Sequence, residues 1–266
     1  METLRGAGNH VKSLKRDIYW NWLSLRRRAW SRWYDEPATL MEMPEGKRVL
    51  VLSPHFDDDA IGCGGTLIKH IKSGVDVSVT YMTDGRGGDS ENPDKESVEC
   101  IRKQEVEKSA NVLGITSLKF LDFPDGDLRC DEQTVSAITS VLKDSKPDVV
   151  YLPWFLDNHR DHQACTSILG RAHRRVGARF KVCAYEVHTP LPKNRIVDIT
   201  GEIERKNAAI SMHESQLRRG DYCDTAVGLN RYRSIHKMKG VGYAEAFIYL
   251  DVEEYIRLSK YLGGFD

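Results

Sequence analysis

The sequence predicts an α/β fold, a three-layer Rossmann-like sandwich with a mostly parallel sheet and a C-terminal substrate-side cap. Short apolar runs alternate with longer amphipathic stretches from residue 39 onward. The run KRVLVLSP at 47–54 has a continuous apolar centre, which is typical of a strand buried on both faces. Strands separated by helices form βαβ units, and their right-handed crossovers build a parallel sheet.

The individual elements follow in the order that such a sheet requires. Residues 61–74 show helical spacing of apolar side chains and close on Gly74, and residues 95–113 form a charged helix that stops at Gly114. Further strands are expected at 75–85, 117–127, 148–155, 179–188, 194–200 and 244–251, and a further helix at 131–145. The strand-rich sequence beyond residue 175 is predicted to form the far edge of the sheet and the cap. Both are expected to belong to one domain at 39–266.

Composition excludes several classes of protein. The 266 residues carry 39 basic and 39 acidic side chains, so no net field favours nucleic acid, and a small neutral substrate fits better. Six cysteines without a C-x-x-C pair argue against a zinc ribbon and a disulfide framework. Without a bilayer-length apolar run or a signal-peptide core, a cytoplasmic protein is expected.

Residues 1–38 are predicted to form a basic, tryptophan-rich helical extension. Eight Lys or Arg side chains stand against Glu2 and Asp17 within residues 1–34, and four of the five tryptophans lie there. Apolar residues from Leu14 to Trp33 recur at three- and four-residue steps, which places them on one helical stripe. Two interpretations stay open: the stripe packs on the body of the protein, or residues 12–34 contact anionic lipid or a partner.

Two polar clusters follow predicted strands and point to one site. HFDDD at 55–59 comes directly after the first strand, and DNHRDH at 157–162 comes after the fourth. Ligands of open α/β sheets bind outside the carboxyl ends of strands, where the strand order reverses. If the order is 3-2-1-4, the two strands are neighbours and the clusters face each other across that crevice.

The residue types in these clusters suit a metal-dependent hydrolase. His55, Asp58 and His162 can supply the three protein ligands of a catalytic zinc, with a fourth position left for water. Asp57 is then a candidate base for that water, and His159 a candidate oxyanion donor. Asp161 can orient His159 through its other ring nitrogen.

These motifs resemble the PIG-L (LmbE-like) deacetylases. SPHFDDDAIGCGGTL at 53–67 is similar to that family's H-P-D-D-E signature, and HRDH at 159–162 to its H-x-D-H. TDG at 83–85, R-x-x-E at 102–105, FPDG at 123–126 and YEVHTPLP at 185–192 extend the resemblance over most of residues 47–250. It implies a zinc-dependent enzyme that removes an N-acetyl or related acyl group from an amino sugar or glycoconjugate.

The resemblance also implies roles for particular residues. Zinc is implied on His55, Asp58 and His162, with Asp57 as general base and a protonated His159, positioned by Asp161, as stabiliser of the tetrahedral intermediate. Arg102 and Asp125 match positions that contact the sugar, and His188 is a further candidate for the pocket. Phe56 replaces the usual proline and Asp59 the usual glutamate, without removing a ligand or the base.

The same residues bear on alternative functions and alternative metals. The spacing of Gly62, Gly64 and Gly65 fails the G-x-G-x-x-G pattern, which argues against a dinucleotide-binding oxidoreductase. A non-catalytic relative that keeps the metal loop for binding or sensing is the second hypothesis. Two histidines and a carboxylate also suit Fe²⁺ or another divalent metal. The remaining histidines on charged helices, His70, His173 and His236, are expected to be solvated.

Overall fold

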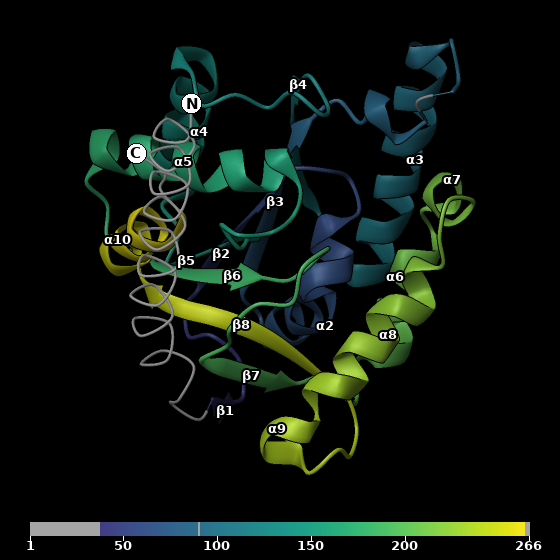
Figure 1. Cartoon of the computed structure of the whole chain (residues 1–266), viewed down its shortest axis with the longest axis vertical. Coiled ribbons are helices and arrows are strands. Elements are labelled where there is room, and N and C mark those ends of the chain that lie inside the picture. The colour runs from purple at the N-terminus through teal and green to yellow at the C-terminus, as the bar shows by residue number, and fades with distance from the viewer. Residues whose placement is uncertain (1–37, 90, 264–266) are drawn as a thin grey trace, which may run out of the picture. The chain divides into compact units, whose positions relative to one another are not determined.

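The computed structural model describes residues 38–89 and 91–263, and these residues form one eight-stranded sheet. The strand order is β1-β7-β8-β6-β5-β2-β3-β4 (Figure 1). The strands are β1 (Thr39–Met41), β2 (Arg48–Ser53), β3 (Asp76–Thr83), β4 (Ser117–Phe123), β5 (Val149–Pro153), β6 (Lys181–Tyr185), β7 (Arg195–Asp198) and β8 (Ala244–Asp251). All pairs are parallel except those that β8 makes with β6 and β7.

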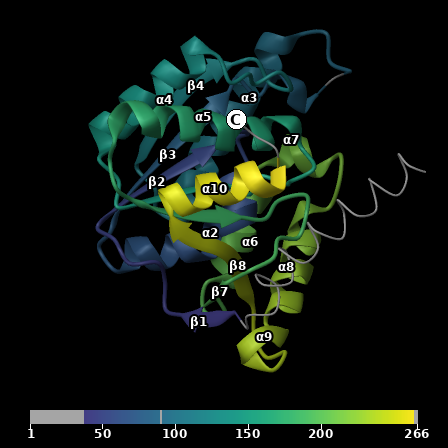
Figure 2. The ribbon, with the colours of Figure 1, turned by 60° about the vertical axis from the view of Figure 1, so that its left-hand side comes forward.

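Helices pack on both faces of this sheet. On one face α2, α3, α6 and α8 contact one another, and on the other face α5 contacts both α4 and α10 (Figure 1, Figure 2). Their bounds are α2 (Asp58–Lys72), α3 (Lys95–Leu113), α4 (Glu132–Ser145), α5 (Arg160–Val176), α6 (Ile203–Ser211), α8 (Tyr222–Arg233) and α10 (Val252–Gly263). Shorter pieces are η1 (Arg86–Gly88), α7 (Glu214–Leu217) and α9 (Ile235–Met238). The predicted three-layer sandwich with a C-terminal cap is confirmed.

The order of the central strands brings the two polar clusters together. In chain order the first four predicted strands are β2, β3, β4 and β5, and they lie as β4-β3-β2-β5, the predicted 3-2-1-4. Val49, Leu50 and Val51 of β2 pair in parallel with Val149, Val150 and Tyr151 of β5. The carboxyl ends of β2 and β5 therefore lie side by side at one edge of the sheet, although about a hundred residues separate them.

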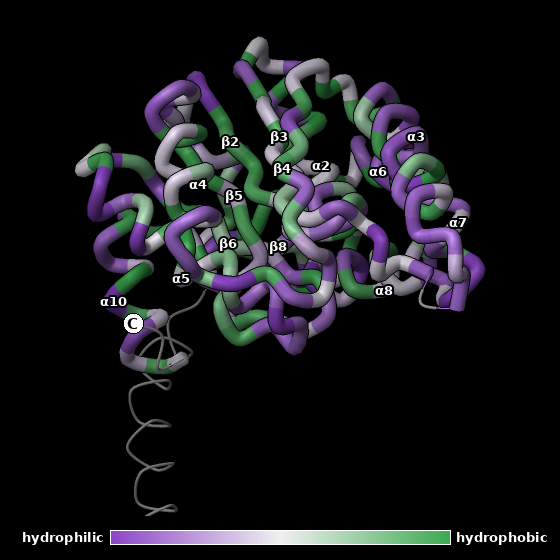
Figure 3. Tube along the Cα trace, turned by 90° about the horizontal axis from the view of Figure 1, so that it is seen from above, coloured by the Kyte–Doolittle hydropathy of each residue, from purple (hydrophilic) through white to green (hydrophobic). Residues whose placement is uncertain are grey.

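The central strands have apolar sequences because their side chains are buried in the core. Val49, Val51, Val149 and Tyr151 are at most 2% exposed and belong to one large apolar cluster. Figure 3 shows the hydrophobic strands β2 and β5 inside, with the hydrophilic α3 outside. No helix among residues 38–89 and 91–263 has the length and apolar character needed to cross a bilayer. The predicted extension falls outside the described residues, except for Ala38.

The expectation of solvated helical histidines is wrong for two of the three. His70 in the last turn of α2 is fully buried, and its Nε2 lies 2.8 Å from the Tyr151 hydroxyl. Position 70 continues the inward stripe of Cys63 and Leu67, so helical spacing brings it under the sheet. His173 is 8% exposed and packs edge-on against Phe180. His236 is partly exposed.

Candidate active site

The first half of the site is the turn from β2 into α2. The hydroxyl of Ser53 donates to the carbonyl of His55 at 2.8 Å, and the helix then begins at Asp58. Asp58 and Asp59 lie in its first turn, where the positive end of the helix dipole favours carboxylates. A Cβ at Gly62 would lie 2.1 Å from the Tyr185 ring, so glycine there lets α2 pack tightly against β6.

The second half is the entry into α5 after β5. His159 is the N-cap of α5, and its Nδ1 accepts the backbone N–H of Asp161 at 3.2 Å. His162 follows in the first turn of the helix and is fully buried. The ring of His162 thereby faces the turn after β2, and its centroid lies 5.1 Å from that of His55. The two clusters share one site, as the sequence predicts.

The three predicted ligand atoms form an equilateral triangle. Nδ1 of His55, Oδ2 of Asp58 and Nε2 of His162 lie 3.1 Å from one another. Around a tetrahedral zinc with bonds of about 2.0–2.1 Å, neighbouring ligand atoms lie about 3.3 Å apart. All three residues are at most 8% exposed. The donor set and its spacing thus fit a tetrahedral divalent metal.

Two further groups could also hold a metal. His159 offers a nitrogen within 4.8 Å of nitrogens of His55 and His162, and Asp125 and Asp161 offer oxygens similarly close to His55. The second group uses the other side of the His55 ring, because Nε2 lies 3.2 Å from Asp161 and 3.3 Å from Asp125. The tighter triangle with Asp58 uses Nδ1. A ring nitrogen that binds a metal leaves the other to donate to a carboxylate, which favours the triangle as the ligand set.

The electrostatics of the triangle call for positive charge beside Asp58. Burial alone would raise the pKa of the Asp58 carboxyl, yet the histidines His162 and His55 hold it well below its usual range. Burial lowers the pKa of His162, but the carboxylates of Asp58 and Asp157 together outweigh burial and raise this pKa to about 9. A buried carboxylate flanked by two histidines is an environment that a bound cation satisfies as well as protons do.

Carboxylates behind the ligands fix the orientation of both rings. Asp161 accepts N–H groups of Gly126 at 2.8 Å and Leu128 at 3.0 Å, and its Oδ2 lies 3.2 Å from His55 Nε2. Asp157, fully buried, lies 3.1 Å from Nδ1 of His162. The sequence reasoning missed Asp157, although it is the first residue of the DNHRDH cluster.

The structure gives Asp161 a different neighbour from the one predicted. Its carboxylate points to His55 rather than to the His159 ring, and only its backbone N–H contacts His159. Helix geometry is the reason: an N-cap side chain folds onto the N–H groups of the first turn, so His159 Nδ1 takes that N–H. The other ring nitrogen of His159 is then the one left to donate.

Asp57 and Arg102 line the mouth of the site. The Asp57 side chain makes no capping bond to α2, so its carboxylate stays available to the pocket. Arg102 of α3 is 2% exposed, and its guanidinium lies 3.6 Å from Asp57 and 3.4 Å from Asp125. It also donates to the carbonyl of Gly85 at 2.9 Å. Arg102 thus ties the predicted base to the predicted sugar contact Asp125.

A pocket of about 190 Å³ reaches two corners of the triangle, His55 and Asp58. It is lined by His55, Asp57, Asp58, Arg102, Asp125, His159 and His188, which are predicted site residues, and by Ile61, Gly87, Gly88, Val187, Gln216, Arg219 and Tyr222. The His188 ring stacks on His162 with centroids 5.3 Å apart. Burial and the nearby His55 lower the pKa of His159, which favours its neutral form over the protonated form that the resemblance implies.

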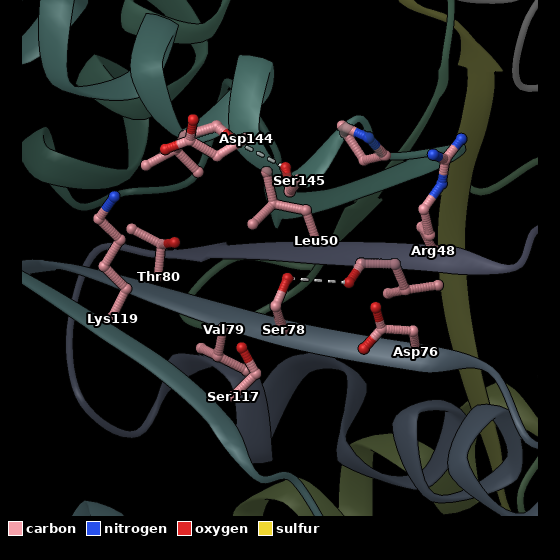
Figure 4. A pocket seen from close by; sticks show the side chains of 13 residues that line it. Arg48, Leu50, Asp76, Ser78, Val79, Thr80, Ser117, Lys119, Asp144 and Ser145 are labelled. Atoms are coloured by element: carbon pink, nitrogen blue, oxygen red, sulfur yellow. Dashed lines mark hydrogen bonds between the residues drawn. The ribbon is translucent and has the colours of Figure 1, made fainter.

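Gln216, Arg219 and Tyr222 are the part of this pocket that sequence reasoning missed. Gln216 belongs to α7, Tyr222 to α8 and Arg219 to the turn between them, and the sequence of this segment carries no recognisable motif. Another cavity, of about 250 Å³, lies at the amino ends of β2, β3 and β4 beside α4 (Figure 4). It contains none of the predicted site residues, because those follow the carboxyl ends.

Both departures from the family signature point into the core. Phe56 is fully buried, its ring packs edge-on against Tyr81 and Phe120, and a Cβ at Gly85 would lie 2.7 Å from it. Asp59 is 2% exposed and accepts the Tyr81 hydroxyl at 3.1 Å, and burial raises its pKa to about 7. Neither side chain lines the pocket, so the two replacements alter the support of the site rather than its lining.

Comparison with known proteins places this site in a family. Residues 50–173 match the PIG-L family, described as GlcNAc-PI de-N-acetylase. A diacetylchitobiose deacetylase of Thermococcus kodakarensis is 33% identical over 191 residues, covering 64% of this chain and 70% of the relative. A 4-oxalmesaconate hydratase of Pseudomonas putida is 26% identical over 234 residues, covering 79% and 89%.

Solved structures agree with the sequence comparison. The N,N'-diacetylchitobiose deacetylase from Pyrococcus horikoshii, in complex with its inhibitor MPG, has a TM-score of 0.69 and 27% identity. The similarity covers 79% of this chain and 86% of that one. The two proteins therefore share their fold over most of both chains.

Proposed function

Because the chain belongs to the PIG-L family of de-N-acetylases, we propose that it is a metal-dependent hydrolase that removes an N-acetyl or related N-acyl group from an amino sugar or glycoconjugate. The observation that carries this proposal is the triangle of His55, Asp58 and His162 with 3.1 Å edges, beside a carboxylate and an imidazole that are not part of it. A hydrolase needs both kinds of group: ligands, and separate acid–base residues.

A divalent metal held by these three residues would acidify a water and polarise the acyl carbonyl. Zn²⁺ is the proposed ion, since a neutral imidazole pair with one carboxylate is a common catalytic zinc set, and Fe²⁺ or another divalent metal is the alternative. The two carboxylates behind the rings, Asp161 and Asp157, hold the ring nitrogens that face away from the triangle.

The residues of the chain divide the proton transfers between them. Asp57 takes a proton from the attacking water and later delivers it to the leaving nitrogen, so that the products are a carboxylate and a free amine. Arg102, 3.6 Å from Asp57, keeps this carboxylate directed at the pocket. His159 accepts the Asp161 N–H on Nδ1, which leaves Nε2–H to donate to the developing oxyanion. Arg102, Asp125 and His188, which all line the pocket, are proposed to contact the sugar.

The test combines metal analysis with a free-amine assay. Purified protein is analysed for Zn and Fe, stripped with a chelator, reloaded with single metals, and incubated with N-acetylglucosamine, its oligosaccharides and its glycoconjugates. We expect amine release that depends on the metal. A metal-loaded protein that releases no amine from any N-acylated sugar would support the non-catalytic alternative, a metal-binding module.

A second enzymatic candidate follows from the Pseudomonas putida relative, whose similarity covers 79% of this chain. That protein is a hydratase, and hydration of an unsaturated acid also begins with an activated water. The same metal-loaded preparation can be assayed for the loss of absorbance of a conjugated unsaturated acid. Such activity without any amine release would favour the hydratase over the deacetylase.

A further inference from the structure

The chain between β6 and β7 forms one side of the pocket. Residues 186–194 contain no helix or strand, and two of them, Val187 and His188, line the pocket. We call residues 186–191 the pocket loop. This loop is fastened at two places: at Asp157, whose carboxylate lies behind the ring of His162, and at Arg233, the last residue of α8. Arg233 itself does not line the pocket.

Asp157 joins the pocket loop to the ligand triangle. Its Oδ2 accepts the backbone N–H groups of His188 at 3.0 Å and of Thr189 at 3.1 Å. Its Oδ1 accepts the backbone N–H of His159 at 3.1 Å and lies 3.1 Å from Nδ1 of His162. Two of these four groups belong to the loop. A shift of the loop would therefore turn the carboxylate that faces the His162 ring.

The two ends of the pocket loop are held by a buried ion pair. Arg233 donates from Nε to Oε2 of Glu186 at 3.0 Å, and one of its terminal nitrogens donates to Oε1. The same nitrogen donates to the carbonyl of Leu191 at 2.9 Å, and the N–H of Leu191 donates to Oε1 of Glu186 at 2.8 Å. All three residues are at most 5% exposed. The planar guanidinium thus fastens both ends of the loop at once, which a compact ammonium group cannot do.

The physical chemistry of this ion pair favours a role in geometry over a role in stability. The cost of removing two charges from water offsets most of the attraction between them, so buried ion pairs add little net stability. Charge-assisted bonds from a guanidinium fork do restrict both distance and direction. Because Glu186 and Leu191 flank residues 187–190, this restriction extends to the N–H groups that Asp157 accepts.

We propose that Arg233 is a positioning residue of the active site. It acts through Glu186 and the pocket loop on Asp157, and through Asp157 on the ring of His162. The same loop presents His188 to the pocket, so Arg233 also affects the binding of substrate. The effect on substrate rests on the proposed deacetylase function, whereas the effect on metal affinity can be measured without turnover.

The experiment uses the full chain and two variants that disrupt the ion pair in different ways. Glu186→Gln combined with Arg233→Gln leaves no unpaired buried charge, and glutamine at 233 cannot reproduce the fork. Arg233→Lys keeps the charge but not the fork. Ile115→Ala removes buried apolar volume just before β4, at the amino end of the sheet, and is the control for a loss of stability alone.

Three quantities are measured on each protein: the Kd for Zn²⁺ by competition with a chelator, amide hydrogen exchange of residues 186–192 in the metal-free protein, and the free energy of unfolding in urea. We expect the double variant to bind Zn²⁺ about three- to tenfold more weakly, because Asp157 remains but is less well oriented. Exchange in residues 186–192 should be at least about tenfold faster. Arg233→Lys should show smaller changes in the same direction, and Ile115→Ala should lose stability without either effect.

Turnover supplies a further readout wherever the wild type releases amine from a substrate that contains N-acetylglucosamine. In the double variant loaded with saturating metal, KM should rise by a larger factor than kcat falls. The reason is that the loop carries His188, whereas the proposed base, Asp57, lies in the turn before α2 and is not displaced.

The outcomes separate this inference from the proposed function. An unchanged Kd for Zn²⁺ in the double variant would overturn the role of Arg233, even if the loop exchanged faster. An equal loss of affinity in Ile115→Ala would overturn it too, since reduced stability would then explain the effect. If the double variant does not fold, Arg233→Lys decides by the same two measurements. If no N-acylated sugar releases amine, the proposed function fails, while Zn²⁺ affinity and exchange still decide this inference.

Discussion

Oδ2 of Asp161 lies 3.2 Å from Nε2 of His55, a residue that precedes it by 106 positions. The contact joins the entry of α5 to the exit of β2, and it places a carboxylate behind the ring whose Nδ1 belongs to the ligand triangle. Two backbone N–H groups, those of Gly126 and Leu128, hold this carboxylate in place. The two residues of the DH pair at 161–162 therefore have different roles. His162 is one corner of the triangle, and Asp161 orients His55, which is another corner.

Asp161→Asn should weaken metal binding. Loss of a carboxylate that orients a ligand histidine typically costs about 10–100-fold in metal affinity. The apparent Kd for Zn²⁺, measured by competition with a chromogenic chelator, reports the change directly. Asp157→Asn, which acts on His162, should behave alike. Unchanged affinity in Asp161→Asn beside a loss in Asp157→Asn would mean that Asp125, 3.3 Å from the same nitrogen, orients His55 alone.

Asp57→Asn should keep its metal and lose turnover. The substitution preserves shape and removes the proton acceptor, and general-base catalysis typically contributes about 10²–10⁴-fold. Metal content by elemental analysis and kcat by amine release are measured on the same preparation. Activity near that of the wild type in the metal-loaded variant would show that another group takes the proton.

His162→Ala should lose the metal, whereas His159→Ala should retain it. His162 Nε2 stands 3.1 Å from both other atoms of the triangle, while His159 enters only the looser group of three histidines. Metal content after dialysis against a metal-free buffer distinguishes the two. Comparable loss from His159→Ala would make His159 a ligand and remove it as the oxyanion donor.

The meeting of the two polar clusters could be predicted from the sequence, because it follows from the topology of the sheet. A reversal of strand order puts the exits of β2 and β5 together, so HFDDD and DNHRDH had to meet if both followed strands. Partners set by local geometry were harder to predict. Which aspartate of DNHRDH faces which histidine ring depends on the N-cap position of His159. Because His159 is the N-cap of α5, its Nδ1 accepts the backbone N–H of Asp161 and not a contact from the Asp161 carboxylate.

The pocket wall formed by Gln216 and Tyr222 could not be predicted from the sequence. Gln216 and Tyr222 reach the site because Glu105 holds Ser215 across a separation of 110 residues. Glu105 belongs to the R-x-x-E motif at 102–105, but nothing in the sequence of α7 indicates that Ser215 is its partner. His70 was predictable in principle, since the stripe of Cys63 and Leu67 that buries it is visible in the sequence.

Phe56→Ala should destabilise the fold strongly. The ring is fully buried between Tyr81, Phe120 and the Arg102 guanidinium, which lies 5.4 Å from its centroid. Removing a buried phenylalanine typically costs about 3–5 kcal/mol through lost burial and the cavity left behind. Urea unfolding of the metal-free protein measures it, with Phe56→Leu as the milder comparison. A loss below about 1 kcal/mol would show that the surroundings collapse to fill the space.

Acidification should destabilise the protein through His70. Burial lowers the pKa of this histidine to about 4, against about 6.5 in the unfolded chain. Between these values the unfolded state binds the proton and the folded state does not, so stability rises with pH. The contribution of His70 is complete above about pH 6.5 and is lost as the pH falls toward 4, with about 2 kcal/mol gone at pH 5.

His70→Gln isolates this contribution, because glutamine can still bond the Tyr151 hydroxyl and does not titrate. Free energies of unfolding from urea titrations at pH 7.5 and pH 5 give the acid loss for each protein. The variant should lose about 2 kcal/mol less than the wild type over this interval, since every other titrating group is common to both. An equal loss in both would mean that His70 takes up a proton in the folded state, and that the space around its unbonded Nδ1 admits water.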